Sequence, residues 1–157
     1  MISWVDLSVR RPDLTEAGQA LLYQFGVGLA FLGTLRRDGA PRVHPIAPLL
    51  HTTGLYGFLS PSRKLDDLKR DPRYALHTYP RPNDEDAFYV SGRALFVPEG
   101  NRLQTLREAY LAERPATPPP NLTEQAVVEL LIDRCLLTRT RGHGDFAPRH
   151  TIWRTDP

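Results

Sequence analysis

Arg63 and Lys64 are the two residues of this sequence whose types and position point most clearly to chemistry. They follow Ser60 and Pro61, a pair that predicts a helix start with serine as the N-cap and proline in the first turn. The predicted helix ends at Asp71, because the proline that follows disfavours helical geometry in the residue before it. Both cations therefore belong to the first turn of a short helix.

Positive charge at that place conflicts with the backbone around it. The first N–H groups of a helix have no intrahelical partner and carry partial positive charge, so cations beside them are unfavourable. A bound anion resolves this conflict, and phosphate is a common anion at helix N-termini. The alternative is that both side chains simply point into water, which costs only tenths of a kcal/mol. On this stretch alone the two interpretations are balanced.

A second polar set, Arg42 and His44, lies on a strand predicted for residues 42–50. Alternation along a strand places both on one face together with Ile46. The strand is predicted to lie at an edge or to be bulged, because Pro45 cannot donate a ladder hydrogen bond. It would lie beside the strand that leads to the two first-turn cations, and four such side chains could hold a doubly charged phosphate. Solvent-facing residues on an edge strand are the alternative.

Other kinds of site find little support in the sequence. The five histidines show no zinc-site spacing and Cys135 has no partner cysteine, so no metal site is expected. There is no G-x-S-x-G elbow for a nucleophile, no P-loop and no G-x-G-x-x-G. No catalytic residue is assigned.

Composition predicts an ordinary globular protein. A length of 157 residues favours a single domain spanning 1–157, and a net charge of +2 with no basic stripe argues against nucleic acid as a partner. The lone cysteine fits a reducing compartment. Neither a signal segment nor a long apolar run is present, so we expect a cytoplasmic protein that is not inserted in a membrane.

The elements expected around these residues are mainly strands. The apolar run 29–35 is typical of a strand buried on both faces, Asp38-Gly39 is a hairpin signal, and Gly92 suggests a bulge within a long strand. Residues 1–14 are expected to wrap the body as an arm. Strands are predicted at 29–35, 42–50, 55–59, 73–79, 87–97, 129–138 and 150–154, with helices at about 13–24, 60–71 and 98–113. This order predicts a mainly β (α+β) fold, a small closed or partly split antiparallel barrel.

Three motifs in order carry a resemblance to a known family. They are L-G-T-L-R-R-D-G-A-P-R-V-H-P-I, then L-Y-G-F-L-S-P-S-R-K-L-D-D-L-K-R-D-P-R-Y-A-L, then V-S-G-R-A. Together they resemble the FMN-binding split-barrel family related to pyridoxamine 5'-phosphate oxidase, over residues 29–97. The resemblance implies a six-stranded antiparallel split β-barrel with flanking helices. It also implies a homodimer with the flavin at the subunit interface.

Site residues follow from this resemblance position by position. Arg63 and Lys64 match the pair that grips the flavin phosphate, and Leu59 and Ser60 match contacts to the phosphate and ribityl chain. The segment 44–46 matches the strand that lines the isoalloxazine and ribityl groups. The complete expected cofactor set is Arg42, His44, Pro45, Ile46, Leu59, Ser60, Ser62, Arg63 and Lys64.

Some positions depart from the oxidase itself. His44 stands where the oxidase has an arginine, and Ala87 lies near the place of a glutamine that comes from the partner subunit. The C-terminal arginine-and-histidine motif is missing, so oxidase activity on the vitamin phosphate is not expected. The resemblance predicts an FMN-dependent oxidoreductase acting on an unidentified small molecule. A reductase using the deazaflavin coenzyme F-420 and a non-catalytic flavin-binding module are the alternatives.

Overall fold

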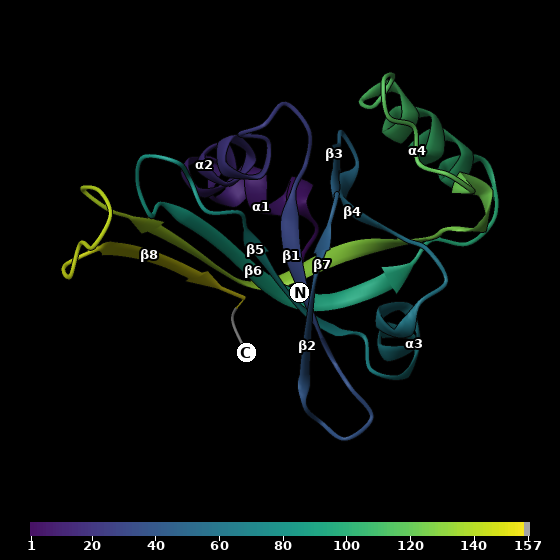
Figure 1. Ribbon diagram of the computed structural model, residues 1–157, viewed down its shortest axis with the longest axis horizontal. Coiled ribbons are helices and arrows are strands. Elements are labelled where there is room, and N and C mark those ends of the chain that lie inside the picture. Colours follow the sequence, from purple (N-terminus) through teal and green to yellow (C-terminus); the bar gives the residue numbers. More distant parts are fainter. Residues whose placement is uncertain (156–157) are drawn as a thin grey trace.

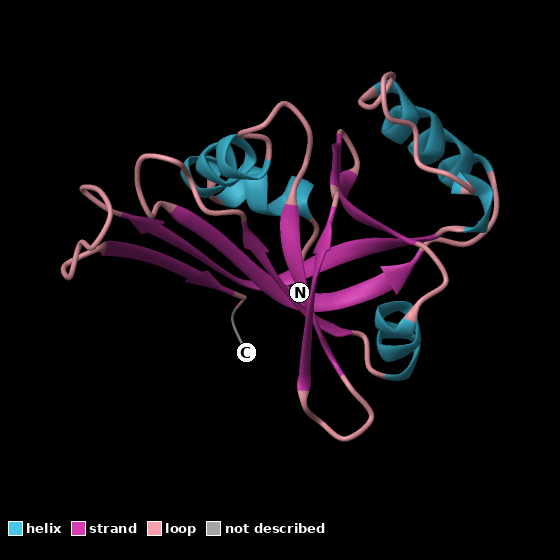
Figure 2. Ribbon diagram, in the orientation of Figure 1, coloured by secondary structure: helices cyan, strands magenta, loops and turns pink. Residues whose placement is uncertain are grey.

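The computed structural model describes residues 1–155, which form eight strands, four α-helices and one 3-10 turn (Figure 1). The strands are β1 (Ala30–Leu35), β2 (Pro41–Ile46), β3 (Leu49–His51), β4 (Gly54–Leu59), β5 (Arg73–Thr78), β6 (Ala87–Phe96), β7 (Ala126–Arg139) and β8 (Arg149–Arg154). The helices are α1 (Trp4–Arg10), α2 (Pro12–Leu22), α3 (Arg63–Arg70) and α4 (Asn101–Ala112), and the 3-10 turn η1 is Leu122–Glu124. Figure 2 shows the helices around the periphery of one curled sheet.

Six of these strands make the split barrel that the sequence predicts. They run in the order β2-β1-β5-β6-β7-β4, every pair antiparallel, and β2 contacts β4 without joining it in a ladder. The split is therefore the seam between β2 and β4. Strand β3 adds to the outer edge of β4, and β8 pairs with the C-terminal half of β7.

The second predicted strand, residues 42–50, is in fact two strands. The ladder of β2 ends at Ile46, and β3 begins at Leu49 after Pro48. Within the described chain β2 pairs only with β1, so the edge position predicted from Pro45 is confirmed. A proline cannot donate to a ladder, which explains why the chain leaves one partner here and joins another.

Burial on both faces belongs to β4 and not to β1, which corrects the sequence prediction. All six residues of β4 are buried, because one face joins the core beneath α1 and α2 and the other packs on α4. Strand β1 alternates between buried and half-buried positions, with Phe31, Gly33 and Leu35 on the less covered face. No helix of the described chain packs on that face.

The long strand β6 carries the predicted irregularity. Its register with β7 shifts between Ser91 and Gly92. A Cβ at Gly92 would lie 1.9 Å from the carbonyl oxygen of Leu131, so only glycine permits this close approach of the two backbones. The bulge bends the sheet and helps it to curl into a half-barrel.

The N-terminal segment, expected from the sequence to wrap the body as an arm, contains helix α1. Helix α1 starts with a capping box in which the Ser3 hydroxyl accepts from the Asp6 N–H and the Asp6 carboxylate accepts from the Ser3 N–H. Trp4 and Leu7 anchor it in the main core, as expected from their apolar character.

Among residues 1–155, no helix combines the length and apolarity that crossing a membrane would require.

Candidate functional site

Helix α3 begins at Arg63, with Ser62 as its N-cap, so the prediction of Ser60 as the cap is wrong. The Ser62 carbonyl accepts hydrogen bonds from the N–H groups of Leu65 and Asp66. Its hydroxyl is turned back to donate to the Ser60 carbonyl at 2.8 Å and makes no capping bond. As predicted, the helix ends before the Asp71-Pro72 step.

The start of α3 is consequently open. The backbone N–H groups of Arg63 and Lys64 find no acceptor in residues 1–155. Neither side chain has a carboxylate partner there, and the Arg63 side chain is exposed. Free N–H groups and two cations are the donors that a phosphate accepts from, so the residues present fit the predicted group.

A buried carboxylate that the sequence analysis missed, Asp67, fixes α3 against the barrel. It is 3% exposed and accepts from Arg42 Nε at 2.7 Å, Thr34 Oγ1 at 3.0 Å and Arg70 Nη2 at 3.2 Å. Burial raises the pKa of the Asp67 carboxyl, but these three donors outweigh burial and hold its pKa below the ordinary value. Arg42 is therefore held by α3, on the barrel wall next to the helix start.

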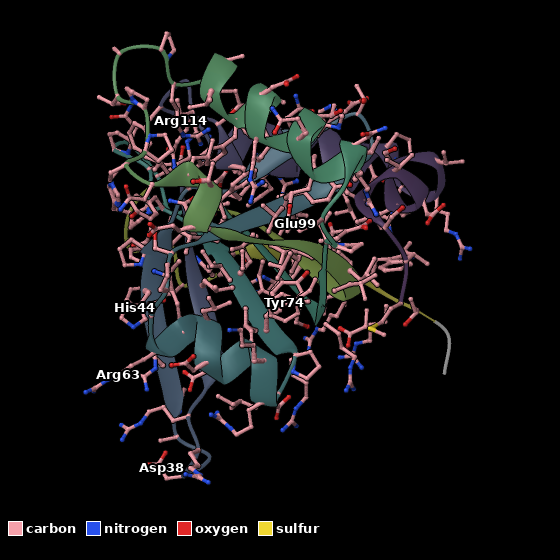
Figure 3. All side chains as sticks on the ribbon, turned by 90° about the vertical axis from the view of Figure 1, so that its right-hand side faces the viewer. Asp38, His44, Arg63, Tyr74, Glu99 and Arg114 are labelled. Atoms are coloured by element: carbon pink, nitrogen blue, oxygen red, sulfur yellow. The ribbon has the colours of Figure 1, made fainter. Side chains whose placement is uncertain are left out.

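The structure brings part of the predicted cofactor set together between the β1–β2 hairpin and α3. Arg42 and Arg63 line a common cavity of about 430 Å³. Figure 3 shows His44 and Arg63 along the same side of the molecule, His44 on β2 and Arg63 at the start of α3. Ser60 is exposed and its hydroxyl accepts from Gln125 Nε2 at 3.2 Å.

Three members of the set lie differently. The side chains of Ile46 and Leu59 are in the main core, at 7% and 0% exposure, so only their backbones could touch a ligand. Pro45 is exposed on the opposite face of β2, beside Phe31 of β1. The alternation predicted for this strand, with Arg42, His44 and Ile46 on one face, agrees with the burial pattern.

The remaining histidines and the cysteine form no second centre. Within residues 1–155, no three histidine, cysteine or acidic side chains gather as metal ligands would. Cys135 is buried on β7, and burial raises the pKa of its thiol to about 11, so the thiolate is scarce at neutral pH.

The sequence matches no protein-family model and no curated protein. Solved structures do match. A heme-binding protein from Mycobacterium smegmatis is 20% identical with a TM-score of 0.62, over 88% of this chain and 57% of that one. An F420 reductase is 17% identical with a TM-score of 0.58, over 74% and 94% of the two chains. A pyridoxamine 5'-phosphate oxidase-related, FMN-binding protein from Nostoc punctiforme is 16% identical with a TM-score of 0.56, over 96% and 97%.

These likenesses show the fold. This chain has the split-barrel fold of the pyridoxamine 5'-phosphate oxidase-related proteins, as its motifs predict. It spans just over half the length of the heme-binding protein, 57%. The ligands named for these structures differ, so the choice of cofactor rests on the site itself.

Proposed function

We propose that this protein is an FMN-dependent oxidoreductase that acts on a small molecule. The observation that carries the proposal is the open start of α3, where two free N–H groups and the cations Arg63 and Lys64 stand beside the seam of a split barrel. The local conflict in the sequence thus persists in the folded chain, since neither cation forms an ion pair with a carboxylate within residues 1–155. A phosphate monoester would neutralise them and satisfy the N–H groups.

In this proposal the chain's residues bind and orient the cofactor. Arg63, Lys64 and the hydroxyls of Ser60 and Ser62 hold the phosphate, with Arg42 adding positive charge from the barrel wall. The exposed edge of β2 around His44 lies along the flavin ring system. The flavin supplies hydride transfer at its N5 position, and the protein supplies orientation and electrostatics.

The proposed homodimer has a candidate surface. The registers of neighbouring strands align one row of side chains across the outer face of the sheet, none of them fully buried. The row is Pro45, Phe31, His77, Tyr89, Leu136 and Ile152. It begins on β2, the strand that also carries the predicted cofactor residues, so a second copy seated there would lie beside the flavin.

A second copy would also cover the half-exposed face of β1, whose apolar run the sequence assigns to a strand buried on both sides. Sedimentation of the purified protein tests the dimer. We expect twice the mass of one chain, and a monomer for Ala75→Arg, which places a charge at the centre of this face. A monomeric parent protein would overturn the dimer.

The chromophore that copurifies tests the cofactor. We expect a yellow protein that releases FMN on denaturation. A colourless preparation that binds only added coenzyme F-420 would replace this proposal by the deazaflavin-dependent reductase, an alternative that the likeness to an F420 reductase favours. A heme Soret band instead would contradict both.

Turnover separates an enzyme from a flavin-binding module. We expect a reduced nicotinamide nucleotide to reduce the bound flavin under anaerobic conditions, followed by reoxidation with at least one of a panel of acceptors. A rate no higher than that of free FMN would favour the module without turnover.

A further inference from the structure

One cavity of the molecule is lined by more arginines than the predicted cofactor set contains. It lies between the β1–β2 hairpin and α3 and measures about 430 Å³, within the range of roughly 300–1,000 Å³ for small-molecule pockets. We call it the arginine basin. Its lining is five arginines and three aspartates: Arg36, Arg37, Arg42, Arg63, Arg70, Asp38, Asp66 and Asp67.

Internal ion pairs use up only part of this charge. Asp38 pairs with Arg36 at 3.0 Å, and Asp67 pairs with both Arg42 and Arg70. Arg37 and Arg63 have no carboxylate partner within residues 1–155, and Asp66 has no cationic partner there, so the five arginines and three aspartates of the lining leave a net charge of +2. Guanidinium groups do not lose their proton in proteins, so the basin remains cationic at any physiological pH.

Two of the basin's walls are fixed in place. The buried Asp67 carboxylate orients Arg42 on β2 and Arg70 at the end of α3, and Arg70 also donates to the Leu35 carbonyl. Arginines held in this way lose little freedom when they bind a further anion, which favours recognition of phosphoryl and carboxylate groups.

The arginine basin adjoins the open start of α3 at Arg63 but extends away from it along the helix. Residues 63, 66, 67 and 70 follow the i, i+3, i+4, i+7 spacing of one helix face, which is turned toward the hairpin. Ser60, Ser62, Lys64 and His44 do not line the cavity. Arg42 and Arg63 stand between the two places.

We propose that the arginine basin is a second anion site, which binds a phosphoryl or carboxylate group of a small co-ligand next to the cofactor phosphate. This second site rests on the proposed function only in one respect, namely that FMN is the molecule bound at the start of α3. Arg36 and Arg37 face the anion from the hairpin, and Arg63 and Arg70 face it from α3. Its volume accommodates a group larger than one phosphate, so a diphosphate is the appropriate probe.

The experiment is a calorimetric titration of the purified protein with inorganic pyrophosphate, first without and then with saturating FMN. The test variant is Arg36→Gln with Arg37→Gln, because neither residue belongs to the predicted cofactor set. The control is Arg10→Gln with Arg149→Gln, two exposed arginines that have no carboxylate partner within residues 1–155, of which Arg149 lines a different cavity. Equal melting temperatures of the variants show that all are folded.

We expect pyrophosphate to bind the parent in both titrations and the control equally well. Removing two charge-assisted contacts should weaken binding by at least about tenfold in the test variant. Unchanged affinity in the test variant, no measurable binding to the parent, or complete displacement of pyrophosphate by FMN would each overturn the second site. If FMN itself fails to bind, the flavin proposal fails. The loss of pyrophosphate affinity in the test variant would still show whether the arginine basin binds an anion.

Discussion

Helices α3 and α4 are each tied to the barrel by a buried carboxylate, but the charge left over differs. In α3 the carboxylate, Asp67, is on the helix and the arginine, Arg42, is on a strand. In α4 the roles are reversed, because Arg102 on the helix donates to Glu129 on β7 at 2.6 Å and to the hydroxyl of Tyr56 on β4 at 2.7 Å.

Around α4 every arginine is compensated. Arg102, Arg107 and Arg114 each have a carboxylate partner. Arg114 is buried and lies 3.9 Å from the centroid of the Tyr110 ring, which itself stacks on Phe58. These contacts join the helix to β4 and need no further ligand.

Around the start of α3 compensation stops at Asp67. Arg63 and Lys64 have no carboxylate partner in the described chain, and the hairpin adds Arg37. The comparison teaches that an arginine count alone does not mark a site. Uncompensated cations do, because these gain from an added anion, and free backbone donors beside them add to that gain.

The largest expected effect is on cofactor binding at the α3 start. Arg63→Ala with Lys64→Ala should weaken FMN affinity by about 3–6 kcal/mol, because two charge-assisted contacts of about 1.5–3 kcal/mol each are lost. Fluorescence titration of the apoprotein with FMN measures this. Lys69→Ala, an exposed cation at the other end of the same helix, should leave the affinity unchanged. If the double variant binds FMN as tightly as the parent, the flavin phosphate does not bind at the start of α3.

The next largest effect concerns the tie between α3 and the barrel. Asp67→Asn should lower the free energy of unfolding by about 3 kcal/mol, since it leaves Arg42 and Arg70 without their buried counter-charge. Denaturant unfolding measures this, with Asp66→Asn, an exposed neighbour, as the control. A loss below that of the control would show that the Asp67 cluster contributes nothing to stability.

The same variant has a defined pH dependence. The pKa of Asp67 is lowered by folding, so its stabilisation is present above the unfolded pKa of about 3.9 and is lost as pH falls through the lower folded pKa. The stability difference between parent and Asp67→Asn should therefore shrink below about pH 4. A difference that instead grows on acidification would contradict the direction of this pKa shift.

A smaller effect is expected at α4. Glu129→Gln should lower the free energy of unfolding by about 1–2 kcal/mol, because Arg102 is partly exposed and water can replace its partner. FMN affinity should not change. Glu108→Gln, on the exposed side of α4, is the matched control. A loss of FMN affinity comparable to that of the Arg63 and Lys64 variant would break the contrast between the two helices.

Local sequence signals account for much of the fold and for the open helix start. Turn residues predict the succession of strands along the chain, and Pro45 predicts an edge or bulged strand. The residue types of Arg63 and Lys64 indicate the conflict at the first turn but leave a bound anion and exposure to water balanced. The choice between Ser60 and Ser62 as N-cap was not decidable locally, since both flank Pro61 and both can cap.

Long-range contacts account for what the sequence could not predict. Asp66 and Asp67 are adjacent in the sequence, but only Asp67 is buried. The reason is its ion pair with Arg42, which lies 25 positions earlier in the chain. Arg36 and Arg37 join the site only because the hairpin packs beside α3. The one local hint for Asp67 is its place between Leu65 and Leu68, which form the buried stripe of the helix.

The smallest predicted effect separates the two helices by their response to salt. Exposed charges are screened as the Debye length falls from about 30 Å at 0.01 M to about 8 Å at 0.15 M, whereas buried pairs are screened much less. FMN affinity should therefore weaken by about 0.5 kcal/mol over this range, the size typical of an exposed ion pair. Titrations at the two ionic strengths measure it, and Arg63→Ala with Lys64→Ala should show a smaller change. Because Glu129 is buried, the loss of unfolding free energy in Glu129→Gln should be nearly the same at both ionic strengths. An equal salt response at both helices would mean that the charge at the α3 start is no more available to a ligand than the charge at α4.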